Sequence, residues 1–316
     1  MKSEENNQTE LSIIILTYNA KDFTLQAVKS LEDNYLEEVS SGKYEVIIAD
    51  NASTDGSLDF FKEYKKKSKI KNLQIVDSGG NIGFSAGNNK GVLSSKGKYL
   101  LFLNPDTIVY KKTLNYLVDF MDSHPEVGAS SCKLINQDGD FDINCHRGFP
   151  TPWNAFCYFS GIQKVLPKNK FFAGYTQGWK DFNTTHEVDA IEGAFMLMPR
   201  SVGEKVKWWD EDYFFYGEDL QFCYNIKKIG YKIYYIGEVS IIHIGGVTSG
   251  IKKKTSNITT ANLEAKRRLQ RERFNAMRIF YRKNYQHTYS SFVFWIINKG
   301  IGFLEKRALR GLKVKN

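Results

Sequence analysis

The first 125 or so residues alternate between short apolar runs and longer segments of helical periodicity, and this alternation constrains the fold more than any other feature of the chain. The apolar runs cover residues 12–16, 44–49, 73–76 and 99–103. Segments with helical spacing of apolar residues lie between or after them, at 21–39, 57–67 and 113–122. Such strand–helix–strand repetition predicts a mostly parallel sheet with helices on both faces. We therefore expect an α/β fold.

Polar residues end three of the predicted strands. The carboxyl ends of parallel strands meet at one edge of a sheet, and ligands of open α/β sheets bind beyond that edge. Three polar strand ends together therefore favour a nucleotide-binding crevice, although each one alone also fits an ordinary turn. They are Thr17-Tyr18-Asn19, Asp50-Asn51 and Asn104-Pro105-Asp106.

A loop rich in glycine and asparagine, "DSGGNIGFSAGNNKG", follows the third predicted strand. Its Gly83 and Gly87 fit a backbone that comes close to a ligand. The loop is not a known nucleotide-binding motif, because the chain has no G-x-G-x-x-G after the first strand and no G-x-x-x-x-G-K-[ST]. The sequence therefore supports neither a dinucleotide-binding fold nor a P-loop.

The pattern weakens in the second half of the chain. Residues 150–185 are aromatic segments with Gly and Pro, which we interpret as a region that faces the substrate. "VDAIEGAFMLMPR" predicts a buried strand, and Glu218-Asp219 begin a predicted helix that stops at Gly230. "KIYYI" and "VSIIHIGG" predict two further strands, the second ending around His243.

The ordered set of motifs resembles the family 2 glycosyltransferases, in particular the bacterial rhamnosyltransferase-like branch that builds cell-surface polysaccharides. The resemblance covers roughly residues 10–250. It implies a GT-A fold and an inverting transfer of a sugar from a nucleoside diphosphate donor, such as dTDP-rhamnose or a UDP-sugar, to an acceptor hydroxyl. It also implies Mg²⁺ or Mn²⁺ as cofactor. The motifs are Thr17-Tyr18-Asn19, "DNASTDGS", "GGNIGFSAGNNKG", "LFLNPDT", "IEGAFMLMPR", "FFYGEDLQF" and "HIGG".

The resemblance also implies which residues bind the donor and its metal. The nucleoside is expected at Thr17, Tyr18, Asn19 and Asp50, and the glycine loop is expected to contact the donor through Asn81, Gly83 and Asn88. The metal-binding D-x-D motif of the family corresponds to Asn104-Pro105-Asp106. Asp106 is then the carboxylate ligand, Asn104 a weaker neutral contact and His243 the later ligand. We expect low metal affinity in the absence of nucleotide.

The proposed reaction needs a base beside the acceptor hydroxyl, because the attack comes from the face opposite the leaving diphosphate. In the resembling enzymes a Glu-Asp pair supplies it, so Asp219 is the expected catalytic base and Glu218 the alternative. A helix N-terminus favours the ionised form of Asp219. From the residues alone, helix capping explains the pair better, and it is the position within the motif set that favours the catalytic role. Many relatives carry another acid where this chain has Gln221, so that support is missing here.

Basic charge is concentrated at the end of the chain. Residues 252–316 contain 17 Lys and Arg and three Glu, a net charge of +14, whereas the preceding residues carry −5. Interleaved aromatic residues predict a helical region that lies on an anionic membrane surface. A helical layer over the catalytic domain is the structural alternative. The alternative functions are a nucleic-acid-binding module and a sugar nucleotidyltransferase, although the chain contains the recognised motif of neither.

The expected organisation is a polar tail at 1–10, a GT-A domain at 11–250 and a basic aromatic helical region at 251–316. The GT-A domain divides into a donor half up to about 125 and an acceptor half at 126–250. No signal-peptide pattern and no apolar window of about 18 to 20 residues occurs. Four cysteines without C-x-x-C spacing suit a reducing compartment. We expect a cytoplasmic protein at the inner face of the plasma membrane, with a glycan or lipid-linked acceptor and no nucleic-acid partner.

Overall fold

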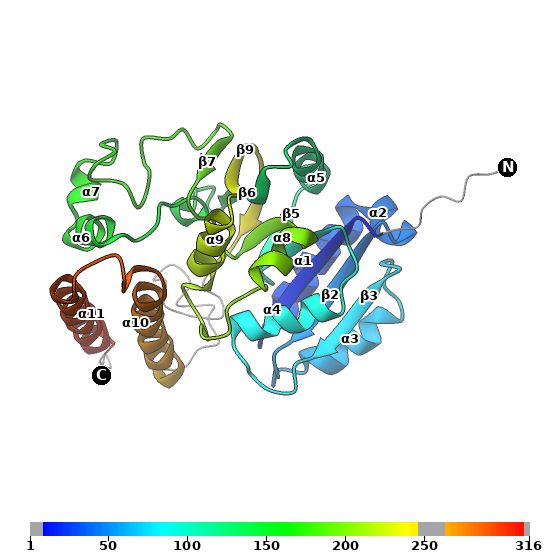
Figure 1. The fold of residues 1–316 in the computed structure, drawn as a ribbon. Helices are drawn as coiled ribbons and strands as arrows, with labels where there is room; N and C mark the ends of the chain where they lie inside the picture. The colour runs from blue at the N-terminus through cyan, green and yellow to red at the C-terminus, as the bar shows by residue number, and fades with distance from the viewer. Residues whose placement is uncertain (1–8, 246–262, 313–316) are drawn as a thin grey trace.

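Figure 1 shows the computed structural model, which describes residues 9–245 and 263–312. Within these residues a nine-stranded sheet runs in the order β3-β2-β1-β4-β8-β6-β9-β5, with β7 added beside β9. The strands are β1 Leu11–Thr17, β2 Tyr44–Asp50, β3 Leu73–Asp77, β4 Tyr99–Leu103, β5 Thr107–Val109, β6 Val127–Ile135, β7 His186–Val188, β8 Phe195–Pro199 and β9 Lys232–His243. The polar tail at 1–8 and the predicted boundary at 250 lie outside the described residues.

The first four strands form the parallel part of the sheet, as the apolar runs predict. β1 pairs in parallel with both β2 and β4, and β2 pairs with β3. All seven residues of β2 are buried, which is typical of a parallel strand covered on both faces. The helices of this half are α1 Lys21–Asn34, α2 Leu36–Ser41, α3 Ser57–Lys65, α4 Phe84–Leu93 and α5 Thr113–Ser123.

The single helix predicted at 21–39 is wrong, because the helix is interrupted at Tyr35. The backbone of Tyr35 is not helical, and the Tyr35 ring is buried in the core. The Tyr35 hydroxyl donates to the carbonyl of Tyr110 at 2.6 Å and accepts from the amide of Leu114 at 2.9 Å. Periodicity does not reveal this tertiary contact, which ends α1 and starts α2.

Antiparallel pairs join the second half to the same sheet. β8 is antiparallel to β4, and β9 is parallel to β6 and antiparallel to β5. The two strands predicted over 232–243 are one strand, whose register against β6 shifts at residues 237–239. The shift accompanies a close backbone approach, since a Cβ on Gly237 would lie 2.5 Å from the amide of Thr184. The strand predicted at 188–199 starts only at Phe195.

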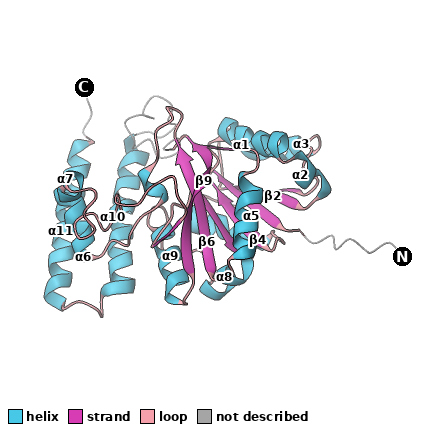
Figure 2. Cartoon of the chain, turned by 90° about the horizontal axis from the view of Figure 1, so that it is seen from above, coloured by secondary structure: helices cyan, strands magenta, loops and turns pink. Residues whose placement is uncertain are grey.

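A helical layer stands at the end of the molecule opposite β3 (Figures 1 and 2). Phe280 and Tyr285 of α10 form a buried cluster with Ile301 of α11, and Ala155 of α6 packs against it. None of the described helices is long and apolar enough to cross a membrane. All four cysteines are buried and free. The remaining helices are α6 Pro152–Ser160, α7 Ile162–Val165, α8 Arg200–Val206, α9 Glu218–Lys228, α10 Leu263–Tyr285 and α11 Ser291–Gly311.

Candidate active site

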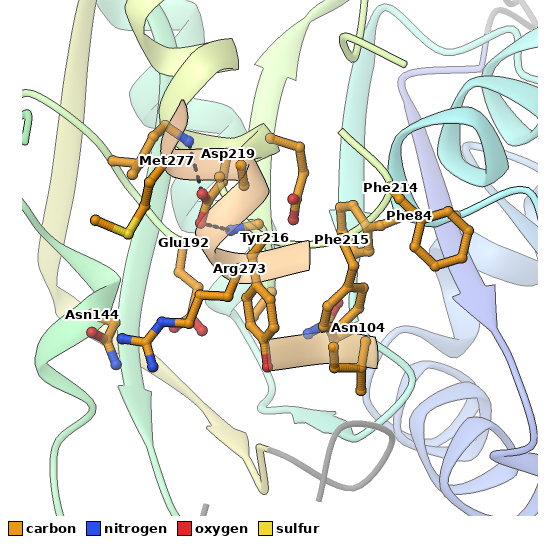
Figure 3. A pocket seen from close by; sticks show the side chains of 18 of the residues that line it. Phe84, Asn104, Asn144, Glu192, Phe214, Phe215, Tyr216, Asp219, Arg273 and Met277 are labelled. Atoms are coloured by element: carbon orange, nitrogen blue, oxygen red, sulfur yellow. Dashed lines mark hydrogen bonds between the residues drawn. The ribbon is translucent and has the colours of Figure 1, made fainter. Parts of the chain in front are cut away.

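A cavity of about 790 Å³ opens at the carboxyl edge of the parallel strands. Its lining comes from four parts of the chain that are distant in sequence: the strand ends of the first half, residues within 144–175, residues 192–194 and 214–220 of the second half, and one face of α10. In Figure 3 the side chains of Asn104, Glu192, Asp219 and Arg273 surround this one space. The predicted strand edge is therefore one wall of the cavity, and the later elements form the opposite wall.

The donor-side wall is a network of asparagines between strand ends. The Asn19 side chain, which follows β1, accepts from the amide of Thr54 at 2.6 Å. Asn51, which follows β2, donates to the carbonyl of Gly83 at 3.2 Å and so holds the glycine loop against the sheet. Gly83 has φ +90°, and a Cβ there would lie 2.6 Å from the carbonyl of Phe214. Glycine is thus required where this loop meets the second half.

Six of the nine predicted donor-binding residues line the cavity, namely Tyr18, Asn19, Asn81, Gly83, Asn104 and Asp106.

Three predicted donor-binding residues lie outside the cavity wall and bond within the protein. The hydroxyl of Thr17 is 2.8 Å from that of Thr24, and the Asn88 amide donates to the carbonyl of Phe84 at 3.0 Å. Oδ1 of Asp50 accepts from the amide of Ser53 at 2.8 Å. The contacts of Thr17 and Asp50 secure strand ends and that of Asn88 lies within α4, and a donor contact at each of the three positions stays a prediction.

Asp106 and His243 meet because β5 pairs with β9, which sets Thr107 opposite His243. Asp106 Oδ1 lies 3.6 Å from His243 Nε2, and Oδ2 accepts from the amide of Gly245 at 3.0 Å. Both side chains are more than nine-tenths buried. Asn104 Nδ2 lies 3.5 Å from the same histidine nitrogen.

Two further acids, which the sequence analysis did not select, belong to this region. Asp142, Glu192 and His243 each offer a ligand atom, and these atoms lie within 4.8 Å of one another. Carboxylate oxygens with one imidazole nitrogen suit Mg²⁺ or Mn²⁺. The residues present therefore fit a divalent cation, and His243 is close both to Asp106 and to the two later acids. Glu192 falls inside the quoted "IEGAFMLMPR" motif, whereas no local signal marks Asp142.

Glu218 and Asp219 begin α9, as predicted, and both are buried. Arg147 forms an ion pair with Asp219 Oδ2 through its guanidinium, and Asp219 Oδ1 accepts from the amide of Leu220 at 2.7 Å. Arg147 therefore places a buried counter-charge against Asp219. No local sequence pattern points to this partner, because the two residues are 72 positions apart.

Glu218 lies in a different electrostatic setting from its neighbour. Burial, and secondarily the charge of Asp219, raise the pKa of Glu218 to about 8. Its Oε2 has no hydrogen-bond partner within residues 9–245 and 263–312. The two carboxyl groups thus differ in their partners: Asp219 forms an ion pair with Arg147, and no ion pair joins Glu218 to a cation in the part of the chain that the structure describes.

Helix α10 supplies the rest of the wall. The Arg268 guanidinium lies 4.4 Å from the centre of the Phe214 ring, and Met277 and Tyr281 line the cavity further along the helix. The structure therefore divides the basic C-terminal region: α10 packs on the catalytic domain, as in the structural alternative, and α11 lies outside it. Among the aromatic residues before α9, Trp209 is buried in the core, whereas residues 214–216 line the cavity.

Two relatives are similar over most of the chain. The low-salt glycan biosynthesis hexosyltransferase Agl10 of Haloferax volcanii is 26% identical over 246 residues, covering 77% of this chain and 69% of that protein. Rhamnosyltransferase WbbL of Escherichia coli is 25% identical over 240 residues, covering 73% of this chain and 82% of that protein.

Solved structures share the fold at low sequence identity. Mannosyltransferase PcManGT from Pyrobaculum calidifontis, in complex with GDP-Man and Mn²⁺, aligns with a TM-score of 0.56 at 15% identity, over 96% of this chain and 73% of that one. TarS 1–349 of S. aureus aligns with a TM-score of 0.53 at 17% identity, over 95% of this chain and 82% of that one. These likenesses confirm the expected GT-A fold.

The family itself follows from the sequence. The profile described as Glycosyl transferase family 2 matches residues 12–181, more than half of the chain. The resemblance drawn from the ordered motifs is thereby confirmed. This protein belongs to glycosyl transferase family 2.

Proposed function

We propose that this enzyme transfers a sugar, with inversion, from a nucleoside diphosphate sugar to an acceptor hydroxyl. The observation that carries the proposal is one cavity with two different poles. Asp106 and His243 form a cation-binding pole at the strand edge, and Glu218 and Asp219 form a carboxylate pole at the start of α9. Separate poles of this kind suit a reaction in which the diphosphate leaves on one side and a hydroxyl attacks from the other.

The donor pole would bind the diphosphate through Mg²⁺ or Mn²⁺. When bound, the cation neutralises the negative charge that develops on the leaving diphosphate. Asp106 and His243 would hold it, with Asp142 and Glu192 close to the same histidine. Asn104 contributes a neutral contact, so the later acids supply the charge that the usual first carboxylate would give.

The acceptor pole would remove the proton from the attacking hydroxyl. Asp219 is our candidate base, and the ion pair with Arg147 fixes its orientation. Glu218 is the alternative, because burial raises its pKa to about 8, which would let this carboxyl exchange a proton near neutral pH.

For the substrates, we propose a dTDP- or UDP-sugar donor, with rhamnose suggested by the relative WbbL. The acceptor would be a lipid-linked glycan of cell-surface polysaccharide synthesis, presented at the anionic inner face of the plasma membrane. Support for this location comes from the net charge of +14 over residues 252–316 and from exposed aromatic residues on α11.

A screen of nucleotide sugars with Mg²⁺ or Mn²⁺ tests the proposed function. A bound donor at about 100 times its Kd should stabilise the fold by about 2.7 kcal/mol, seen as a metal-dependent rise in Tm. An oligonucleotide serves as the comparison ligand. Stabilisation by the oligonucleotide and by no nucleotide sugar would contradict the proposal.

A further inference from the structure

An exposed apolar surface covers the end of the molecule where α6, α7 and α11 stand (Figures 1 and 2). We infer that residues 153–171 and α11 together form one membrane-docking surface, which leads a lipid-linked acceptor into the cavity. The inference rests on the proposed function for the acceptor. It adds a second membrane contact, from the middle of the chain, to the one expected from the C-terminal region.

Helix α11 has two apolar faces. One face packs against α10 around the buried Ile301. The other carries side chains that are 49% to 69% exposed, and their spacing along the helix sets them on one side. The rings of Phe292 and Trp295 stack with their centres 6.3 Å apart. The exposed side chains are Phe292, Trp295, Ile296 and Phe303.

Residues 153–171 form the second part of the surface. The ring of Trp153 lies 4.9 Å from that of Phe171 and 5.7 Å from that of Phe156, so these exposed aromatic residues form a cluster. Together the two segments hold ten of the 18 large apolar side chains that are exposed within residues 9–245 and 263–312, and a concentration of this kind marks an interaction surface. This segment contributes Trp153, Phe156, Phe159, Val165, Leu166 and Phe171.

The positive charge of the surface favours an anionic bilayer as its partner. Residues 143–180 contain no Asp or Glu, and the exposed Lys164, Lys168 and Lys170 lie among the apolar side chains. On α11 the single acid, Glu305, pairs with Arg278 of α10 at 2.6 Å, which leaves the exposed basic residues of the helix to other partners. Aromatic residues mixed with cations suit anionic headgroups. A second copy of this chain would instead bring like charges together.

The docking surface continues into the active-site cavity. Phe159 is 39% exposed and also lines the cavity, next to Ala155 and Tyr158 on the same helix. Phe280 and Tyr281 of α10 line the cavity as well. An acceptor whose lipid stays in the bilayer can therefore reach the carboxylate pole along an apolar path, while the donor binds at the strand edge.

Tryptophan fluorescence tests the two parts separately, because Trp153 and Trp295 are exposed on different segments. Brominated phospholipids in phosphatidylglycerol vesicles should quench both residues. Trp153→Phe and Trp295→Phe should then each lose part of the quenching. Quenching that is unchanged in Trp153→Phe and absent in Trp295→Phe would overturn the inference, since α11 alone would contact the membrane.

A charge placed in the second segment gives the matching affinity measurement. Phe156→Glu should weaken binding to these vesicles about tenfold, because an apolar side chain is replaced by an anion. Leu36→Glu, on the exposed surface of α2 at the other end of the molecule, is the matched control and should bind as the wild type does. Equal affinity of the two variants would overturn the inference.

Two other occupants of the surface would also overturn the inference. One is an oligonucleotide, if the wild-type protein binds it in preference to the vesicles. The other is a second copy of the chain, if the wild-type protein dimerises without lipid and Phe156→Glu is monomeric. Metal-dependent stabilisation by a nucleotide sugar separates this inference from the proposed function. If the vesicle results fail while that stabilisation is present, only the docking surface is refuted. If the stabilisation is missing in the wild type, the proposed function fails first.

Discussion

The two walls of the cavity are built in different ways. On the donor side, neighbouring strand ends are joined by short polar contacts, such as Asn51 to Gly83 at 3.2 Å. On the acceptor side, the key contact joins Arg147 to Asp219 across 72 residues, and α10 comes from the far end of the chain. The asparagine network of the donor wall thus depends on neighbouring parallel strands, whereas the Asp106–His243 pair and the acceptor wall both depend on contacts between residues far apart in the sequence. Substitutions on the two sides should therefore have different consequences.

The largest expected effect is on catalysis at the acceptor wall. Asp219→Asn keeps the size of the side chain and removes the proton acceptor, so the transfer rate should fall roughly 10²- to 10⁴-fold while donor binding survives. Asp33→Asn, an exposed carboxylate of α1 outside the cavity, is the control. Near-normal turnover of Asp219→Asn would give the role of base to Glu218.

The second effect is on stability at the same wall. Arg147→Met removes the partner of a buried carboxylate and should lower the free energy of unfolding by about 3–5 kcal/mol, measured by urea denaturation. Lys66→Met breaks the exposed pair with Glu63 on the donor side and should cost less than about 1 kcal/mol. Similar losses in the two variants would mean that the acceptor wall does not depend on its buried ion pair.

A smaller effect concerns pH. The pKa of Glu218 is raised to about 8 in the folded protein, above its usual value of 4.5. Between these two pH values the carboxyl group keeps its proton in the folded chain and loses it in the unfolded chain. Stability should therefore fall as the pH rises from about 4.5 to about 8. Glu218→Gln lacks this proton exchange, so its Tm should rise relative to the wild type across the window. A Tm difference that does not change with pH would indicate an ordinary pKa for Glu218.

The same contrast explains what the sequence could predict. The strands of the first half and their polar ends follow from local periodicity, and six of nine predicted donor residues line the cavity. Arg147 could not be predicted as the partner of Asp219, because no local pattern links them. The break at Tyr35 depends on a hydroxyl contact with Tyr110, which is also invisible to periodicity. Helix α10 was predicted as a helix, but its place in the cavity wall depends on tertiary packing.

The separation of the two poles is tested most directly by metal-dependent nucleotide binding in two variants. Isothermal titration calorimetry with a nucleoside diphosphate and Mg²⁺ or Mn²⁺ would compare Asp106→Ala with Asp219→Asn. We predict that Asp106→Ala abolishes the metal-dependent affinity with the fold intact, and that Asp219→Asn retains the affinity of the wild type. Unchanged metal-dependent affinity in Asp106→Ala, or its loss in a folded Asp219→Asn, would contradict a cavity with a donor pole at the strand edge and an acceptor pole at α9.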